Sequence, residues 1–474
     1  MAIHRKTKIV CTLGPATHER TIIQKLARAG MDVARLNFSH GSYEEHEDRI
    51  VSIRSTSQEL ERPLAILQDL PGPKIRTGRL KEERVWLEDS EEIVLTTDDI
   101  VGDASRISVT LETLPQDVSP GDSIFVNDGM IRLEVIDTTA NEIRCNIATG
   151  GLLTPMKGIN VPGVRLSTDA VTEADLRHLE FGLRQGVDYV GLSFITDAAD
   201  VNKAKSFIRD HGADTPVIAK IERRQALENI DEIIDAADGI MVARGDLGVE
   251  VPLRRVPLEQ KRIISKCNKA GKPVIVATQM MESMVYAPGP TRAEASDVAN
   301  AIFDGADAVM LSAETAIGSY PVQVVGMMAA IAIEAASALP YQAMLRDKGE
   351  TVIPQPDEAI SYSAVSIAQR LDAAVILAFT TSGSTARRVA KFRPECPVLA
   401  LTSREEVLRR LSLFWGLRPH LVGEYSSVEE IFAEGTRIAR SLGMARRGDL
   451  IVMTAGVPFG VPGNTNMLKI QRVE

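Results

Sequence analysis

The sequence predicts an α/β protein built on a (β/α)8 barrel, with a small all-β domain inserted into the barrel and a C-terminal α/β domain. Three strand–helix units precede residue 72, and five more follow residue 165. Between them, short strand-like runs alternate with Gly, Pro, Asp and Asn, which is typical of an all-β domain. A polar, proline-bearing stretch at 344–358 then precedes a further α/β region and is a candidate linker.

The barrel strands are expected where short apolar runs begin strand–helix units. The first three are at 7–13, 32–38 and 64–70, and the other five are at 187–194, 216–222, 239–244, 273–279 and 306–312. An open doubly wound sheet is the alternative. Such a sheet usually has a glycine-rich phosphate loop after its first strand, and no GxGxxG motif follows 7–13. The sequence therefore favours the barrel.

These elements divide the chain into four segments. The barrel takes residues 1–71 and 166–342, the inserted β domain takes 72–165, and the C-terminal α/β domain takes 343–474. Strands of the last domain are expected at 373–380, 397–402 and 449–456. Thr172 is expected near the N-cap of the first helix after the insert.

Composition excludes several classes of protein. With a net charge of −10 and a pI near 5.4, the chain lacks the basic face that nucleic-acid binding needs. Its four cysteines form no CxxC pair and are expected to be buried thiols in a reducing compartment. The longest apolar run, 324–339, contains Glu334 and is better explained as a buried helix than as a membrane span. Together with the absence of a recognisable signal peptide, this predicts a cytoplasmic protein.

Polar residues gather where the expected barrel strands end. Chemistry in such barrels collects at the C-terminal ends of the strands, so these side chains should meet at one mouth. Structural packing hardly explains polar groups at seven strand ends. The residues are Arg35, Asn37, Ser39, Asp69, Ser193, Lys220, Glu222, Arg244, Asp246, Thr278 and Ser312.

Lys220 and Glu222 are the most informative pair. They lie two positions apart in a strand of core residues and therefore face the same side. Burying two ions is costly unless they pair or bind something. By itself, the stretch fits a structural ion pair as well as a catalytic site. The other polar strand ends favour the catalytic site.

The types of residue indicate the chemistry. Glu222 and Asp246 offer hard oxygen ligands, which suit Mg²⁺ or Mn²⁺ better than zinc. Arg35, Lys220 and Arg76 are cations suited to a phosphorylated or carboxylated substrate. No cysteine or histidine ends a strand as a nucleophile or base, so metal-assisted chemistry on an anion is favoured.

The segment 243–250 (ARGDLGVE) adds a possible anion site. Gly245 would let backbone N–H groups approach a ligand at the start of a short helix. The alternative is an ordinary turn with an N-cap aspartate.

Several longer segments then follow one another in the order of a known family. They are 35–41 (RLNFSHG), 69–78 (DLPGPKIRTG), 157–163 (KGINVPG), 219–227, 241–250, 277–284, 290–315 and 380–394. These segments resemble pyruvate kinases, and the similarity extends over essentially the whole chain. The resemblance implies a phosphotransferase that converts phosphoenolpyruvate and ADP to pyruvate and ATP. It also implies a homotetramer.

The resemblance implies roles for particular residues. Lys220 would stabilise the enolate oxygen, Arg35 would contact the transferring phosphoryl group, and Thr278 would lie beside the carbon that is protonated. The backbone at Gly245 and Asp246 would bind the substrate carboxylate. Glu222 and Asp246 would hold the Mg²⁺ or Mn²⁺. The inserted domain would close over the mouth as a lid. Residues facing the nucleotide would be Asn37, Ser39, His40, Arg76 and Lys157.

One position departs from a common pattern of the family. Many members have Glu where this chain has Lys74, and those usually need K⁺. The corresponding K⁺ ligands here would be Asn37, Ser39, Asp69 and the carbonyl of Leu70. We expect the ammonium of Lys74 to replace K⁺, because these acceptors would otherwise lack a cation. The alternative is a solvated lysine on the hinge to the lid.

The C-terminal domain contains a candidate effector loop. Its hydroxyl groups and backbone N–H groups precede a helix and form a possible phosphate cradle for a phosphorylated metabolite. Arg387, Arg388 and the loop 455–466 could complete it. A helix cap without a ligand is the alternative. The loop consists of Thr380, Thr381, Ser382, Gly383, Ser384 and Thr385.

Two other functions are compatible with part of this pattern. A metal-dependent lyase or aldolase would share the carboxylates but would not need Arg76 or Lys157. A catalytically inactive relative would be expected to have lost Lys220, Glu222, Asp246 or Thr278, and all four are present.

Overall fold

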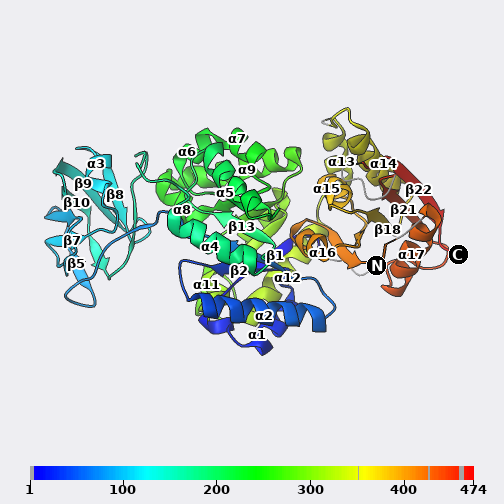
Figure 1. Cartoon of the computed structure of the whole chain (residues 1–474), viewed down its shortest axis with the longest axis horizontal. Helices are drawn as coiled ribbons and strands as arrows, with labels where there is room; N and C mark the ends of the chain where they lie inside the picture. The colour runs from blue at the N-terminus through cyan, green and yellow to red at the C-terminus, as the bar shows by residue number, and fades with distance from the viewer. Residues whose placement is uncertain (1–4, 351, 425–426, 458–463) are drawn as a thin grey trace.

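The computed structural model describes residues 5–350, 352–424, 427–457 and 464–474. Eight parallel strands close into a barrel in the order β1-β17-β16-β15-β14-β13-β3-β2 (Figure 1). This confirms the barrel and excludes the open sheet. The strands are β1 (Lys8–Leu13), β2 (Val33–Asn37), β3 (Ala65–Asp69), β13 (Tyr189–Leu192), β14 (Val217–Ile221), β15 (Gly239–Ala243), β16 (Val274–Ala277) and β17 (Ala308–Leu311).

Amphipathic helices surround the barrel because each strand is followed by a segment with one apolar face. Capping boxes fix the starts of three helices, at Ser42 with Glu45, at Thr172 with Asp175, and at Thr291 with Glu294. Thr172 is thus the N-cap that the sequence predicts. The helices are α1 (Arg20–Ala29), α2 (Tyr43–Glu59), α4 (Glu173–Arg184), α5 (Ala198–Asp210), α6 (Arg224–Glu228), α7 (Ile230–Ala236), α8 (Arg244–Glu250), α9 (Val256–Ala270), α10 (Arg292–Phe303), α11 (Ala313–Ala316) and α12 (Pro321–Ser337), with short 3-10 turns η1 (Pro15–Thr17), η2 (Leu253–Arg255) and η3 (Glu282–Val285).

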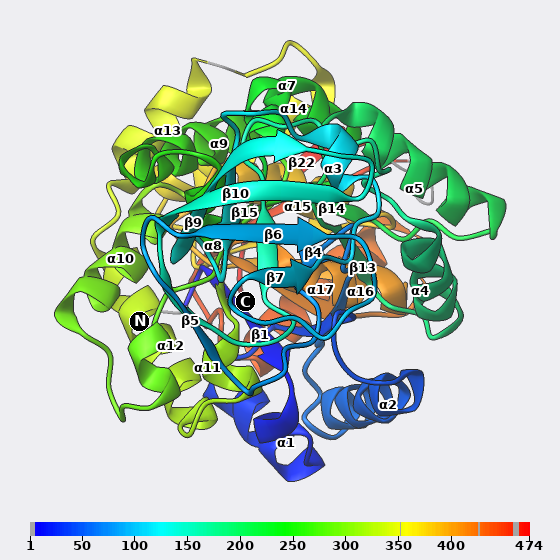
Figure 2. The same ribbon diagram turned by 90° about the vertical axis from the view of Figure 1, so that its left-hand side faces the viewer.

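Residues between β3 and α4 form a separate β unit with its own apolar core. Figure 2 shows its strands in front of the barrel. It touches the barrel at α8, where a Cβ atom on Gly129 would lie 3.5 Å from Val249 Cγ2. The larger sheet has the order β4 (Ile75–Arg76), β12 (Gly158–Asn160), β8 (Ser123–Val126), β9 (Ile131–Thr138), β10 (Glu142–Thr149), β6 (Glu92–Thr96) and β7 (Arg106–Ser108), beside the pair β11 (Gly151–Leu153) and β5 (Val85–Leu87) and the short helix α3 (Leu114–Asp117).

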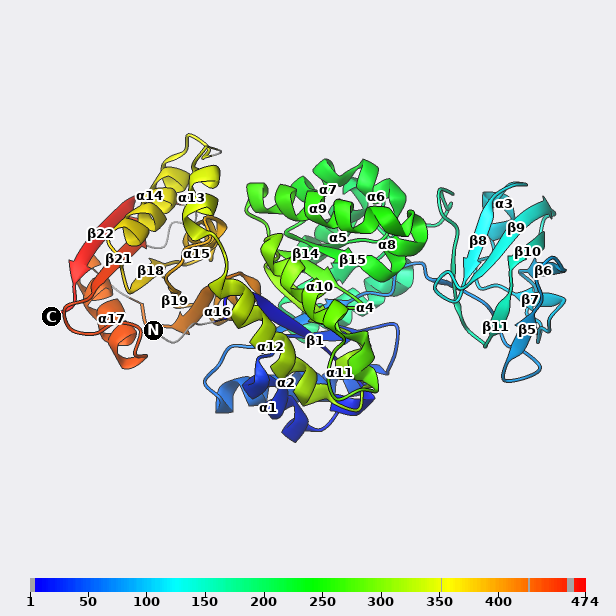
Figure 3. The same cartoon turned by 180° about the vertical axis from the view of Figure 1, so that it is seen from behind.

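The C-terminal unit is a five-stranded sheet with helices, at the end of the barrel opposite the insert (Figure 3). Its order is β20 (Leu417–Leu421), β19 (Val398–Thr402), β18 (Val375–Phe379), β21 (Leu450–Ala455) and β22 (Met467–Arg472), and only β22 is antiparallel to its neighbour. The sequence did not predict β20 or β22. The helices are α13 (Tyr341–Gly349), α14 (Pro356–Arg370), α15 (Ser384–Lys391), α16 (Glu405–Arg410) and α17 (Val428–Ser441), with the turn η4 (Leu411–Leu413).

The linker prediction for 344–358 is wrong over much of its length. Residues 344–349 lie in α13, because buried Leu345 packs into the core of the C-terminal unit. Helix α14 begins at Pro356, where proline suits the first helical turn. The boundaries between the four segments remain predictions.

Four aspartates, three of them buried and Asp238 partly exposed, link neighbouring barrel strands at the N-terminal ends of the strands. Each lies just before one strand and accepts a backbone N–H from the neighbouring strand. These hydrogen bonds stabilise the N-terminal rim, whereas catalytic residues in such barrels lie at the opposite, C-terminal rim. The pairs are Asp32 with Ile9, Asp188 with Ile66, Asp238 with Val217, and Asp307 with Val274.

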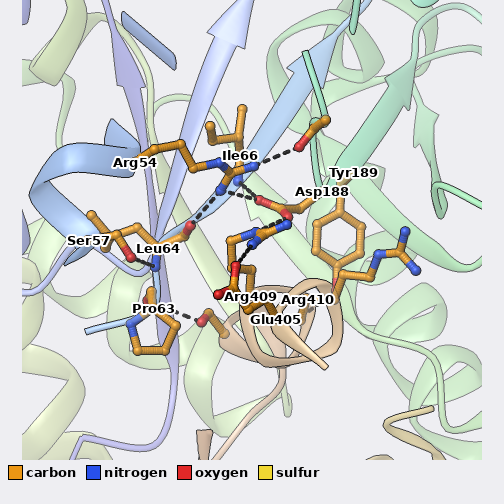
Figure 4. A network of polar contacts seen from close by, with 12 residues as sticks. Arg54, Ser57, Pro63, Leu64, Ile66, Asp188, Tyr189, Glu405, Arg409 and Arg410 are labelled. Carbon is orange, nitrogen blue, oxygen red and sulfur yellow. Dashed lines mark hydrogen bonds and ion pairs between the residues drawn. The ribbon is translucent and has the colours of Figure 1, made fainter. Parts of the chain in front are cut away.

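The C-terminal unit binds to the same rim through ion pairs. Asp188 is buried and accepts from Arg54 and from Arg409 of α16, each at 2.8 Å (Figure 4). The Tyr189 hydroxyl donates to the carbonyl of Arg410 at 2.5 Å. At the start of β17, Asp307 accepts a hydrogen bond from Arg393 of the C-terminal unit at 2.7 Å. Buried charge pairs of this kind fix the geometry of the contact, because separating them would leave unpaired charges.

No single helix in the described part of the chain is long and apolar enough to cross a membrane. Only α12 and α13 together meet the length and composition criteria, and they are bent by 71° relative to each other.

Candidate active site

Lys220 is the centre of the candidate site. It lies near the end of β14, and its ammonium contacts Glu222 Oε1 at 2.9 Å, Asp69 Oδ1 at 3.2 Å and Ser193 Oγ at 2.6 Å. These groups come from the ends of β3, β13 and β14, as the strand-end argument predicts. The ion pair considered for Lys220 and Glu222 therefore exists, and it is part of a larger polar cluster.

Arg35 joins this cluster through Asp69. Its Nε donates to Asp69 Oδ2 at 2.6 Å, and its Nη1 donates to Thr12 Oγ1 at 2.9 Å. Thr12 is not among the residues predicted from the sequence, although it lies near the end of the first strand. The same strand-end rule would have found it.

Neighbouring opposite charges keep Lys220 and Asp69 ionised although both are buried. Burial by itself lowers the pKa of Lys220, but the carboxylates of Asp69 and Glu222 outweigh it and raise that pKa above its usual value. Burial opposes ionisation of Asp69 as well, and the cations of Lys220 and Arg35 nevertheless lower its pKa. Lys220 is therefore a fixed positive charge at neutral pH.

Glu222 and Asp246 fit a divalent metal ion. Burial raises the pKa of Glu222, the charge of Lys220 opposes this, and the negative charge of Asp246 adds to it. The two carboxylates are thus within electrostatic reach, and a cation between them would relieve the repulsion. No group of three or more His, Cys, Asp and Glu side chains in the described residues could hold a metal. Substrate and water would have to complete the ligand set, as is usual for Mg²⁺.

Gly245 and Thr278 are also brought together. The N–H of Gly245 donates to Thr278 Oγ1 at 2.8 Å, and the Thr278 hydroxyl donates to the carbonyl of Ala277 at 2.7 Å. A Cβ atom on Gly245 would lie 3.4 Å from Thr278 Oγ1, at van der Waals contact, so the two residues lie close together. One of the backbone groups proposed for the substrate carboxylate therefore already has a partner within the protein.

The cations of the insert gather at its junction with the barrel. Arg76 pairs with Gly158 across β4 and β12, next to Lys157, and its Nη1 donates to the carbonyl of Met156 at 3.0 Å. Lys74 Cε would lie 3.4 Å from a Cβ atom on Gly158. Partial desolvation lowers the pKa of His40, and the charges of Arg76, Lys74 and Arg35 lower it further. The junction is therefore electropositive and faces His40.

Three of the four acceptors predicted around K⁺ already have partners within the protein. Asn37 Oδ1 accepts from the N–H of Ser39 at 3.1 Å, and the Leu70 carbonyl accepts from Ser193 Oγ at 2.6 Å. Asp69 has two cationic neighbours, Arg35 and Lys220. The premise that these acceptors lack a cation is therefore wrong for Asp69. The ammonium of Lys74 has no hydrogen bond or ion pair to any described residue.

The candidate effector loop lies in the C-terminal unit, away from this cluster. It links β18 to α15, and Gly383 at the helix cap has φ of 84°, which favours glycine. Thr380 Oγ1 is buried without a hydrogen-bond partner among the described residues. Arg388 pairs with Asp357 at 2.6 Å, and the Arg387 guanidinium lies over Phe414. Both arginines are thus already engaged, and residues 458–463 of the loop 455–466 lie outside the described residues.

Comparison with known proteins gives a consistent result. Residues 4–325 match the family model "Pyruvate kinase, barrel domain", and residues 358–471 match "Pyruvate kinase, alpha/beta domain". The chain is 45% identical over 471 residues to a pyruvate kinase of Staphylococcus aureus (strain MRSA252), covering 99% of this chain and 80% of the relative. It is 46% identical over 469 residues to a pyruvate kinase of Geobacillus stearothermophilus, covering 98% and 80%.

Solved structures agree. A crystal structure of a pyruvate kinase from Cryptosporidium parvum superposes with a TM-score of 0.94 at 34% identity, covering 99% of this chain and 96% of the other. The barrel and the C-terminal unit thus match the same family. The chain belongs to the pyruvate kinase family.

Proposed function

We propose that the protein transfers the phosphoryl group of phosphoenolpyruvate to ADP, giving pyruvate and ATP. The observation that carries this proposal is the ammonium of Lys220 held among Glu222, Asp69 and Ser193 at the barrel mouth. A permanent buried cation is suited to an enolate that appears as the phosphoryl group leaves.

The protein's own groups supply positioning and charge. Arg35, fixed by Asp69 and Thr12, would bind the transferring phosphoryl group, and Lys220 would take the enolate oxygen. Protonation of the methylene carbon beside Thr278 then gives pyruvate. The electropositive junction at Arg76 and Lys157 would bind the phosphates of ADP, with Asn37, Ser39 and His40 nearby. Closure of the insert over α8 would exclude water.

A divalent metal ion, Mg²⁺ or Mn²⁺, fits Glu222 and Asp246. When bound, it would neutralise negative charge on the substrate phosphate and carboxylate. The backbone at Gly245 and Asp246 would hold the carboxylate if the N–H of Gly245 turned from Thr278 to the ligand.

A coupled assay tests the function. Purified protein is mixed with phosphoenolpyruvate, ADP and Mg²⁺, and ATP and pyruvate are measured separately. Equal formation of both products is expected. Pyruvate formation without ADP would indicate hydrolysis of phosphoenolpyruvate, with inorganic phosphate as the second product. Formation of neither product would indicate an inactive relative or an enzyme of another class, such as a lyase.

We further propose that Lys74 makes the enzyme independent of K⁺. Its ammonium is close enough to influence His40 and has no described partner, so it can supply the monovalent charge at the nucleotide side. Because Asp69 is already paired, the charge would act on Asn37, Ser39 and the substrates.

Lys74→Glu should convert the enzyme to K⁺ dependence. The reason is that the substitution removes the fixed cation and adds a carboxylate able to bind K⁺. Activity without KCl should fall about tenfold, roughly the effect of one charge interaction near a surface, and KCl should restore it. NaCl at equal ionic strength and the variant Lys81→Glu, an exposed lysine of the insert, serve as controls. A variant that remains indifferent to K⁺ would refute the proposal.

We also propose that Thr380–Thr385 bind a phosphorylated metabolite that activates the enzyme. Support comes from the unpartnered hydroxyl of Thr380 next to the start of α15. Sugar monophosphates, sugar bisphosphates and AMP should be titrated at sub-saturating phosphoenolpyruvate. One of them should lower the half-saturating substrate concentration, and Thr380→Val should abolish this response without changing basal activity. No response to any of these compounds would count against an effector site.

Finally, we propose a homotetramer. Leu253 in η2, Leu258 in α9 and Tyr286 next to η3 are 75%, 66% and 83% exposed, and burying such large apolar side chains between subunits would be favourable. The molar mass measured by sedimentation equilibrium decides this, and a monomer at micromolar concentration would exclude it.

A further inference from the structure

The turn that carries Thr278 has a strained backbone. Thr278 has φ of 70° and Gln279 has φ of 55°, so two successive residues other than glycine adopt left-handed conformations. A β-branched residue such as threonine is especially unfavourable there. Such a conformation costs free energy and persists only where its surroundings enforce it. Something next to this turn must therefore hold it.

The guanidinium of Arg244 makes the contacts that can do so. Its Nη2 donates to the carbonyl of Thr278 at 2.9 Å and to the carbonyl of Gln279 at 3.2 Å, and its Nε lies 3.3 Å from the first carbonyl. These are the carbonyl groups of the two strained residues. The side chain of Arg244 is only 11% exposed, so the contacts are largely shielded from water.

Asp297 of α10 fixes the other side of the guanidinium. Its carboxylate oxygens lie 2.8 Å and 2.7 Å from Arg244 Nη1. The planar guanidinium group thus contacts two backbone carbonyls and one carboxylate at the same time. A lysine ammonium could not reproduce this geometry, because it is a single point with a flexible stem.

The residue after Arg244 holds the threonine side chain. Gly245 donates its N–H to Thr278 Oγ1, while Arg244 holds the Thr278 carbonyl. Two adjacent residues of α8 therefore fix both the backbone and the hydroxyl of Thr278. The next residue, Asp246, is the candidate metal ligand, so one short segment links the metal position to Thr278.

We propose that Arg244, braced by Asp297, is a positioning residue that holds Thr278 at the reacting carbon. The Arg244 guanidinium is occupied by protein groups, namely two backbone carbonyls and the carboxylate of Asp297, so it would act through Thr278. The inference rests on the proposed function, because it assumes that Thr278 lies beside the carbon that is protonated. It assigns Arg244 to the second half of the reaction. In that half, the enolate left by phosphoryl transfer takes up one proton from the solvent at its methylene carbon and becomes the ketone.

The test separates the two halves by measuring ATP and pyruvate independently at early times. The wild-type protein should form them in equal amounts. In Arg244→Ala, kcat should fall about 100-fold, as expected for a misplacement of roughly 1 Å, while the KM for ADP stays within about threefold. Early ATP should exceed pyruvate, because enolpyruvate then leaves the site and converts to the ketone in solution.

Rescue and matched variants complete the experiment. Guanidinium ion at millimolar concentration should restore part of the kcat of Arg244→Ala. Arg244→Lys, which keeps the charge and most of the volume, should fold with an unchanged melting temperature and still show excess ATP. Asp297→Asn should show the same defect more weakly. Arg255→Ala, which removes an exposed arginine paired with Glu259, should behave as wild type.

Two results would overturn the inference. One is equal ATP and pyruvate in both Arg244 variants, with no rescue by guanidinium, since a merely structural role lowers both products together. The other is wild-type kcat in Arg244→Lys. A wild-type protein that forms neither product would instead refute the proposed function, so the two failures are distinguishable.

Discussion

Lys220→Met should lower kcat for pyruvate formation by about 1,000-fold, the scale observed when one preorganised group that stabilises an oxyanion is removed. Methionine keeps the length of the side chain but not its charge. The enolate would then form next to Asp69 and Glu222 without a cation. Binding of ADP should change much less, because its proposed contacts lie at the junction with the insert.

The same substitution should destabilise the folded protein. Removing the ammonium leaves the buried carboxylate of Glu222 without a cation and Asp69 with Arg35 alone, and breaking a buried ion pair in this way costs about 3–5 kcal/mol. Lys220→Met/Glu222→Gln should recover much of the melting temperature but none of the activity. Lys203→Met, which removes a half-exposed lysine paired with Asp169, is the matched control. Substantial activity in Lys220→Met would show that this amine does not stabilise the reaction.

Glu222→Gln should weaken metal binding by about 100-fold or more, given that changes to outer-shell partners alone cost 10–100-fold. Glutamine keeps the shape and can still accept the N–H of Phe194, which donates to Glu222 Oε2 at 2.7 Å. It removes one of two negative charges from the candidate metal site. Mn²⁺ binding followed by electron paramagnetic resonance measures the affinity directly, and the Mg²⁺ dependence of activity should shift in parallel.

A control variant separates the effect of the Glu222 charge on metal binding from the effect of removing any glutamate. Glu228→Gln changes an exposed glutamate paired with Arg224 and should leave Mn²⁺ binding unchanged. If Glu222→Gln binds Mn²⁺ as tightly as the wild type, then Glu222 serves only as the structural partner of Lys220.

The sequence predicted those features that repeat along the chain. Eight strand–helix units predicted the barrel, and the side chains at their ends predicted the cluster around Lys220, because parallel strands in a barrel place their ends at one rim. The resemblance added roles that spacing alone does not provide. The sequence alone could not show whether Lys220 and Glu222 pair with each other or each bind a different ligand. That choice depends on the side-chain rotamers, which are determined by packing.

Other features depended on tertiary packing and were missed or mistaken. The polar composition around α13 predicts a linker, but this segment is helical and its Leu345 is buried in the core of the C-terminal unit. Asp69 was expected to need an added cation, but Arg35 and Lys220 approach it from strands distant in sequence. The left-handed backbone of Thr278 and Gln279 leaves no sign in a sequence without glycine at that point.

The closure of the barrel also determines how this chain can be synthesised. Strand β1 pairs with β17, Lys8 beside Ala308, and β3 pairs with β13 only after the whole insert has been made. During translation, the first three strands therefore leave the ribosome with both outer edges lacking partners, and such edges invite pairing with other chains. Contacts between residues so distant in sequence form slowly. Nascent copies of this enzyme should thus depend on chaperones until the last barrel strand emerges.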